Sequence, residues 1–251
     1  MSTDTAGALL SVIHEDDDLL VVDKPAGLVV HPSKDGEMSS LIGRVRLHLG
    51  HAEGRLVNRI DRETTGLVVV AKQASVAKEL GRLFAGRDVT KRYLAVVHGS
   101  VAPGHQRIVA ALGPDAHSAV AIKNCVREDG APAETDVWCR RTFARGGLPL
   151  SLVEVQPATG RKHQIRIHLA HIGHPIVGDK IYGGDEQVYL RFVTRTLTDA
   201  DRRWLVVENH ALHAGILRFT WRARKWAFEA RPDQRFEDLA GAVPGPTPQP
   251  C

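Results

Sequence analysis

Cysteine is scarce in this chain: its 251 residues include three cysteines, and none of them forms a C-x-x-C pair. So few cysteines exclude a disulfide framework and predict a reduced, intracellular protein. The chain also lacks a secretory signal and any apolar run near the length of a membrane helix, so we expect a cytoplasmic protein with no membrane partner. The nucleotide-binding patterns G-x-x-x-x-G-K and G-x-G-x-x-G are absent as well, and we expect no cofactor.

The length and the strand signals predict one α+β domain. A chain of 251 residues is long enough to bury one sizeable core. Many short apolar runs separated by turn residues favour a mixed α+β fold over a doubly wound one. We expect this domain to span residues 11–239, with a flexible tail at residues 1–10 and a disordered Pro/Gly-rich tail at residues 240–251.

Charge is distributed unevenly along the chain. The formal net charge is +4 and the isoelectric point is about 9.1, which are modest values for a nucleic-acid binder. The segment Val153–Gly183 is a basic centre, in which Asp179 is the only acid after Glu154. By contrast, the acidic run Glu15–Asp18 is expected to face away from phosphate. The cations of the basic centre are Arg161, Lys162, Arg166 and Lys180.

One carboxylate stands among arginines just before an apolar run, in the sequence RLVNRIDRETTGLVVVAK. The run Leu67–Ala71 predicts a buried strand, and Asn58–Gly66 predicts a loop that enters it. Asp61 therefore lies on a loop that a core strand anchors, and the neighbouring Arg59 and Arg62 are expected to favour its ionised form. On these residues alone, a solvated turn of mixed charge is the favoured interpretation.

Two further elements, a strand and a helix, are predicted in the segments that follow. The alternation in Lys91–Gly99 predicts a strand that carries Tyr93, which on its own indicates no more than a tyrosine at the edge of the core. Residues 162–172 predict a helix that ends before Gly173 and buries Ile165, Leu169 and Ile172. Four histidines crowd this region without a matched zinc spacing or a Cys or carboxylate among them, so we expect no metal. They are His163, His168, His171 and His174.

The segment Leu217–Arg231 mixes cations with aromatic residues and leaves two interpretations open. Strand alternation predicts Arg222 and Arg224 on one face, with Phe219 and Trp221 on the other. That pattern is typical of an RNA-binding face, and equally of an edge strand with an apolar inner face and a solvated outer face.

Four segments in this order resemble the RluA family of pseudouridine synthases, which isomerise uridine in ribosomal or transfer RNA. They are DDLLVVDKPAGLVVHP at 17–32, RLVNRIDRETTGLVVVAK at 55–72, KRYLAVVHG at 91–99 and VEVQPATGRKHQIRIHLAHIGHPIVGDKIYG at 153–183. A fifth, HALHAGILRF at 210–219, is similar to the closing strand of the family. The resemblance covers roughly residues 12–220, with Asn58 where the family usually has His and Thr65 where it usually has Ser. It implies a largely antiparallel bent mixed sheet flanked by helices, with a central cleft.

The resemblance also implies roles for individual residues. Asp61 matches the catalytic aspartate, Tyr93 the active-site tyrosine and Arg166 the basic residue of the fourth motif. An ionised carboxylate can attack a sugar or remove a proton from it, an arginine keeps a buried carboxylate ionised, and a tyrosine ring can stack on a detached base. Arg59 resembles the side chain that enters the RNA as the base flips out. The RNA-binding residues expected are Arg59, Arg62, Arg161, Lys162, His163 and Gln164.

The expected partner is ribosomal or transfer RNA, bound by a monomer, with no role for DNA. Target choice is expected from the segments Ser100–Cys139 and Gly184–Asn209. An RNA-binding protein that keeps the fold without catalysis is the alternative, and it is motivated by Asn58. A single-carboxylate RNA hydrolase is disfavoured because no metal site is expected.

Overall fold

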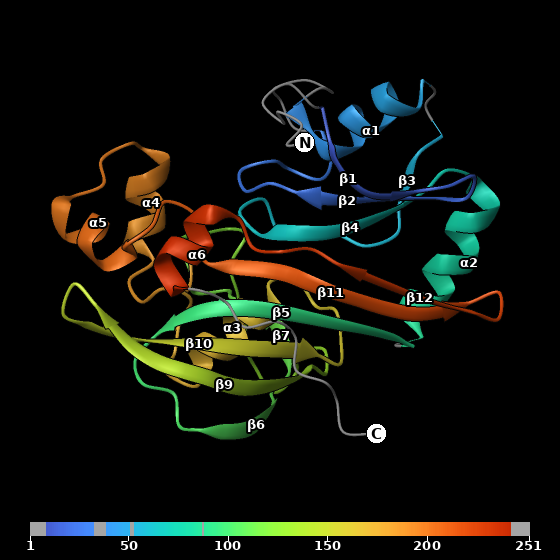
Figure 1. Cartoon of the computed structure of the whole chain (residues 1–251). Helices are drawn as coiled ribbons and strands as arrows, with labels where there is room; N and C mark the ends of the chain where they lie inside the picture. The colour runs from blue at the N-terminus through green and yellow to red at the C-terminus, as the bar shows by residue number, and fades with distance from the viewer. Residues whose placement is uncertain (1–8, 33–38, 51–52, 87, 242–251) are drawn as a thin grey trace.

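The computed structural model describes residues 9–32, 39–50, 53–86 and 88–241 (Figure 1). Within these ranges, ten strands form one large sheet and six α-helices pack around it. The α+β class expected from the sequence is therefore confirmed. Nearly all of the tails expected at residues 1–10 and 240–251 lies outside the described residues. No helix in the described ranges is long and apolar enough to cross a membrane.

The large sheet is almost wholly antiparallel, as expected. Its order is β1 (Ser11–Glu15), β2 (Leu19–Lys24), β4 (Thr65–Ala71), β11 (Leu212–Trp221), β5 (Val89–His98), β10 (Leu148–Pro157), β9 (Glu134–Arg145) and β6 (Gly104–Val109). Two more strands join beside this path, β3 (Arg55–Leu56) on β4 and β12 (Arg224–Glu229) on β11. The β4–β11 pair is parallel and lies in the middle of the sheet. A separate two-stranded sheet contains β7 (Leu112–Pro114) and β8 (Asn124–Val126).

The helices cover the sheet at several points (Figure 1). They are α1 (Leu41–Leu49), α2 (Ala74–Ala85), α3 (Gln164–His171), α4 (Gln187–Val193), α5 (Asp199–Leu205) and α6 (Gln234–Ala240). Both α4 and α5 lie in the segment Gly184–Asn209 that the sequence marks as a source of target choice.

The central strands are apolar on both faces, which explains their continuous hydrophobic runs. Along β4, Leu67 and Val69 pack into one core cluster, whereas Val68 and Val70 pack into another on the opposite face. Helix α2 adds Val76 and Leu80 to the first cluster, and α1 covers the second. Because burying one such side chain contributes roughly 1.5–3 kcal/mol, these strands form a rigid support for the loops that leave them.

Gly66 allows β4 to start directly beside β11. Its φ is +108°, and a Cβ at this position would lie 2.3 Å from the carbonyl oxygen of Ala214. No other residue fits so close to a neighbouring backbone in this conformation. The loop that carries Asp61 therefore ends where the two parallel strands meet.

The segment Leu217–Arg231 is a β-hairpin rather than one strand, so the expected pairing of Arg222 with Arg224 on one strand face is wrong. Arg222 and Ala223 form its turn, with φ of 48° and 57°, the geometry of a two-residue hairpin turn. Arg222 contacts the carboxylates of Glu79 and Asp18 at 3.0 and 2.9 Å. Since Trp226 is buried on the inner face, the hairpin matches the edge-strand interpretation.

Candidate active site

The loop that carries Asp61 is fastened to the strands on both sides. Lys24, at the end of β2, is fully buried and its Nζ donates to the carbonyl oxygens of Pro25, Leu28 and Arg62 at 2.8, 3.0 and 2.9 Å. Burial lowers the pKa of Lys24 to about 7, while the Asp61 carboxylate acts against that shift. The role of Lys24 was not predicted, because its three partners are carbonyl groups that no residue pattern reveals.

Asn58 fastens the other end of the same loop. Its Oδ1 accepts the backbone N–H of Val69 at 2.8 Å, and its Nδ2 donates to the carbonyl oxygen of Leu67 at 3.2 Å. The side chain therefore bonds along β4 as an additional strand backbone would. Asn58, where the family usually has His, leaves the loop ordered.

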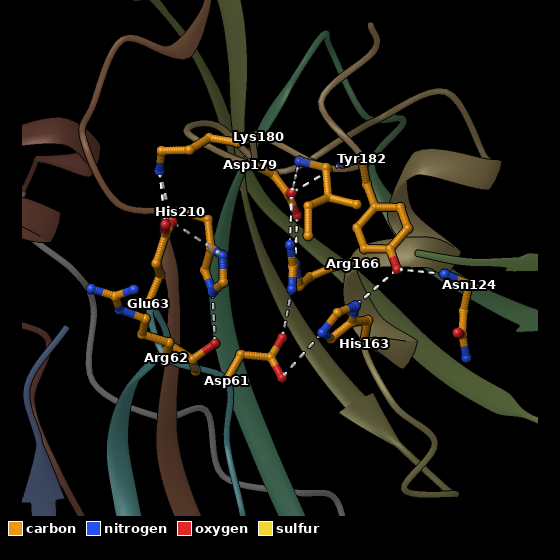
Figure 2. Close-up of polar contacts among 12 residues, drawn as sticks. Asp61, Arg62, Glu63, Asn124, His163, Arg166, Asp179, Lys180, Tyr182 and His210 are labelled. Carbon is orange, nitrogen blue, oxygen red and sulfur yellow. Dashed lines mark hydrogen bonds and ion pairs between the residues drawn. The ribbon is translucent and has the colours of Figure 1, made fainter. Parts of the chain in front are cut away.

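Asp61 lies at one end of a chain of charged groups that continues into the core (Figure 2). Its Oδ2 accepts from Nη1 of Arg166 at 2.8 Å. Arg166 in turn donates from Nε and Nη2 to the two carboxylate oxygens of Asp179, at 2.6 and 2.9 Å. The side chain of Asp61 is 27% exposed, that of Arg166 6% and that of Asp179 0%. The buried Asp179 carboxylate thus binds Nε and Nη2 of the guanidinium, which leaves Nη1 to bond to Asp61.

This arrangement keeps Asp61 ionised. Burial, the largest single influence, raises the pKa of Asp61, but the Arg166 guanidinium, together with His163 and His210, holds that pKa below its usual value. The sequence neighbours do not supply this charge, so the expectation for Arg59 and Arg62 is wrong. Arg62 is exposed and donates from Nε to the carbonyl oxygen of Gly27 at 3.0 Å. Arg59 is exposed and makes no hydrogen bond or ion pair within the described residues.

Asp179 is a site residue that sequence analysis did not identify. Its Oδ1 also accepts the backbone N–H groups of Ile181 and Tyr182 at 2.9 and 3.0 Å. Burial opposes ionisation, but Arg166 and these donors hold the pKa of Asp179 far below its usual value. One feature of the sequence could have indicated Asp179 as a site residue: it is the only acid after Glu154 in the basic centre.

We expect Asp179→Asn to lower the free energy of unfolding by about 3 kcal/mol or more at neutral pH, because a buried guanidinium loses an ionic partner. The depressed pKa means that the Asp179 contribution is complete above its unfolded-state pKa of about 3.9 and is lost as the pH falls below it. The gap between wild type and variant should therefore narrow below about pH 4. Urea unfolding across this pH range measures it, and a gap independent of pH would contradict the ionic explanation.

His163 lies on the other side of Asp61. Its backbone φ of +56° is left-handed and not helical, so α3 begins at the next residue, Gln164, two residues later than expected. Its Nε2 is 3.9 Å from Oδ1 of Asp61, and its Nδ1 is 2.9 Å from the Tyr182 hydroxyl, which accepts the backbone N–H of Asn124 at 3.1 Å. Burial, followed by the nearby Arg166, lowers the pKa of His163 to about 4, so the ring is neutral at pH 7. This arrangement favours a proton on Nε2, facing Asp61.

Two polar residues of the basic centre are occupied in holding the structure together. The Gln164 amide bonds to Thr159, Arg161 N–H, the Glu134 carbonyl and Thr135 at 2.7–3.0 Å, so it orders the Thr159–His163 loop and offers no free group to RNA. Lys180 is buried and donates to both carboxylate oxygens of Glu63 at 2.9 Å. Neither side chain is free for phosphate.

A cavity of about 820 Å³ opens above Asp61, within the usual range for ligand sites. Eight of the nine predicted site residues line it, and only Arg62 does not. Asp61 is the only acid among the described residues that line the cavity, whereas the cations there are Arg59, Lys91, Arg161, Lys162 and Arg166. The ionised Asp61, which is paired with Arg166, thus lies among cations suited to an anionic ligand.

Tyr93 reaches this cavity from β5. Burial, together with the Asp61 carboxylate, raises the pKa of Tyr93 to about 12, so its hydroxyl keeps its proton at neutral pH.

The histidines of the basic centre are not gathered around one point: His168, for example, contacts Thr135 and the carbonyl of Ala110 at 2.8 and 3.0 Å. No group of three or more metal-binding side chains exists within the described ranges.

Comparisons with known proteins match the part of the chain that carries most of the motifs named above. Residues 18–171 match the model of the RNA pseudouridylate synthase family. A protein of Xanthomonas campestris named ribosomal large subunit pseudouridine synthase D is 38% identical over 214 residues, which are 84% of this chain and 61% of that protein. An uncharacterized RNA pseudouridine synthase of Aquifex aeolicus is 35% identical over 181 residues, which are 69% of this chain and 56% of that protein. The chain spans less than two thirds of the length of either relative.

Two solved structures share the fold. Human RNA pseudouridylate synthase domain containing 1 superimposes with a TM-score of 0.73 at 28% identity, covering 93% of this chain and 88% of that chain. Human RNA pseudouridylate synthase domain containing 4 does so with a TM-score of 0.67 at 25% identity, covering 90% of each chain.

Proposed function

Because this chain belongs to the RNA pseudouridylate synthase family, we propose that it is an isomerase that converts specific uridines of ribosomal or transfer RNA to pseudouridine. The observation that carries the proposal is the ionised Asp61 in a cavity whose other charged lining residues, among those described, are cations. A single carboxylate with no second acid beside it suits a reaction that needs one nucleophile or base.

The reaction exchanges one bond to the sugar for another. The bond between C1′ of ribose and N1 of uracil breaks, a bond between C1′ and C5 forms, the C5 proton leaves and N1 gains a proton. Asp61 begins this sequence either by attacking the sugar or by removing a proton from it, and both roles require the ionised form that Arg166 maintains.

Tyr93 supports the detached base in this proposal. Its ring offers a flat surface on which uracil can stack. With a pKa of about 12 its hydroxyl is a donor at neutral pH rather than a base. It can relay the C5 proton only if it passes on its own proton in the same step.

The target nucleotide must leave its helix to reach Asp61, because the carboxylate lies inside the cavity. Arg59 is exposed at the cavity rim and free of partners in the described part of the chain. A planar guanidinium there can stack on the bases that the flipped uridine leaves behind. Against the binding-only alternative, which Asn58 motivated, stand the two bonds by which Asn58 anchors the loop of Asp61.

The test of the proposal is carbodiimide mapping of pseudouridine in total ribosomal and transfer RNA from a strain that lacks this gene. We expect RNA treated with the purified protein to gain pseudouridine at one or a few positions that untreated RNA lacks. RNA that is bound but gains no such position would contradict the isomerase and support the binding-only alternative. The same experiment identifies the RNA, whereas the cytoplasmic location, the monomer and the absence of a role for DNA stay predictions.

We expect the double substitution Arg161→Gln and Lys162→Gln to weaken RNA binding, because both cations are exposed at the cavity rim. Each phosphate contact contributes roughly 0.7–0.9 to the slope of log affinity against log salt, so the slope should fall by up to about 1.8. Titrations of labelled RNA at several salt concentrations measure the slope. An unaltered slope would show that this rim does not meet phosphate.

A further inference from the structure

One wall of the cavity is formed by residues outside the basic centre. It consists of the second half of α2 and the start of β5, which adjoin at one end of the sheet (Figure 1). This wall carries one charged group, Lys91, whose Nζ reaches the loop Pro157–Lys162 and lies 4.0 Å from where a Cβ on Gly160 would be. No acid in the wall lines the cavity with it.

Lys91 is a partly buried cation whose side-chain partner among the described residues is an aromatic ring and not a carboxylate. Its Nζ lies 5.4 Å from the centre of the Phe84 ring, and it makes no hydrogen bond or ion pair within the described residues. Burial alone lowers the pKa of Lys91, with no carboxylate to act against the shift. Arg166, the other buried cation in the cavity, has two carboxylate partners. An unpaired charge in such a place costs stability, so an anion supplied by a ligand would complete it.

The register of β5 fixes where that anion would lie. Lys91 and Tyr93 are two residues apart and so share one face of the strand, about 7 Å from each other along its axis. Arg92 points to the other face, where it pairs with buried Glu154 at 3.0 Å. A base stacked on Tyr93 therefore has Lys91 at a distance that one sugar-phosphate unit spans.

We propose that Lys91 binds a backbone phosphate adjoining the uridine that is held between Asp61 and Tyr93, an inference that rests on the proposed function. A compact ammonium suits a phosphate oxygen and carries no base specificity, so this contact sets the position of the flipped nucleotide and not the choice of sequence. Lys91 is thus a positioning residue, which holds the sugar while Asp61 acts on it.

The first test compares Lys91→Met, Lys91→Arg and the exposed control Lys225→Met on the RNA identified by mapping. We expect Lys91→Met to lower kcat/KM roughly tenfold or more, mainly through KM, and to reduce the salt slope by roughly 0.7–0.9. Lys91→Arg should restore much of the loss, and Lys225→Met should leave the catalytic constants unchanged. Because the substitution removes an unpaired charge and keeps the apolar stem, the thermal midpoint of Lys91→Met should equal or exceed that of wild type.

The second test replaces a phosphate beside the target uridine by a neutral methylphosphonate, on the 5′ and the 3′ side in turn. At the linkage that Lys91 contacts, the methylphosphonate should lower the kcat/KM of wild type about as much as Lys91→Met lowers it on normal RNA. Combining the methylphosphonate with Lys91→Met should lower kcat/KM little more than either change alone. Full additivity at both linkages, or a wild-type salt slope in Lys91→Met, overturns the inference. Both outcomes are measured against an active wild type, whereas a wild type that forms no pseudouridine refutes the proposed function itself.

Discussion

Asp61→Asn is expected to reduce pseudouridine formation by at least about 10⁴-fold, because the amide can neither attack the sugar nor take a proton from it. The substitution keeps the size of the side chain, and its oxygen can still accept from Arg166 at the observed 2.8 Å contact. The fold and the cavity should therefore persist. RNA affinity should stay within a few fold of wild type or rise, since a negative charge leaves a cavity lined by cations.

Single-turnover assays on the mapped RNA, run beside a binding titration, measure both quantities. Asp17→Asn is the matched control, because it removes the same charge from an exposed residue outside the cavity. A full rate in Asp61→Asn with normal binding would remove Asp61 from the reaction. Equal losses of rate and binding would instead assign it to RNA recognition.

Arg166→Ala is expected to lower turnover at least roughly a hundredfold at neutral pH while RNA binding changes far less. Without the guanidinium, Asp61 keeps its burial but loses the strongest of the charges that act against it, so the pKa of Asp61 rises. Activity requires the ionised carboxylate, and the acidic limb of the pH–rate profile should therefore move to higher pH. Raising the pH should recover part of the lost turnover.

The pH profile separates this electrostatic role from simple loss of structure. Arg166 lies between two carboxylates, so its removal also leaves Asp179 unpaired and destabilises the fold. Arg166→Lys is the companion variant: it keeps the charge but cannot contact both carboxylates in the same geometry, and it should restore the wild-type position of the acidic limb with a lower maximum. An acidic limb unmoved in Arg166→Ala would contradict the proposed partnership with Asp61.

Local patterns predicted the supports of the site well. The apolar run after Gly66 and the alternation around Tyr93 correspond to β4 and β5, and the helix expected at residues 162–172 is shortened by two residues at its start and one at its end. Such patterns record which face of an element is buried, and burial is the main force that places strands and helices. The helix start was missed because the left-handed backbone of His163 depends on its contacts with Tyr182 and Asp61.

The charges around Asp61 could not be assigned from neighbours in sequence. Arg59 and Arg62 flank it in the chain, yet neither bonds to it, while Arg166 reaches it from 105 positions away. The family motifs implied that partnership, but not the carboxylate of Asp179 behind it. Electrostatic effects depend on distance and burial, which a linear pattern does not record.

The sequence by itself determined the family, the α+β class, and the identity of Asp61, Tyr93 and Arg166 as residues of one site, because ordered motifs and hydrophobic periodicity are properties of the chain. Only the tertiary structure decided which of the many cations are neutralised and which are free. Lys180 and Arg166 are paired with carboxylates in the interior, whereas Lys91 in the cavity wall has no carboxylate partner within the described ranges. A charge becomes available to a ligand only where folding leaves it without a partner, and that depends on which distant residues the fold brings to it.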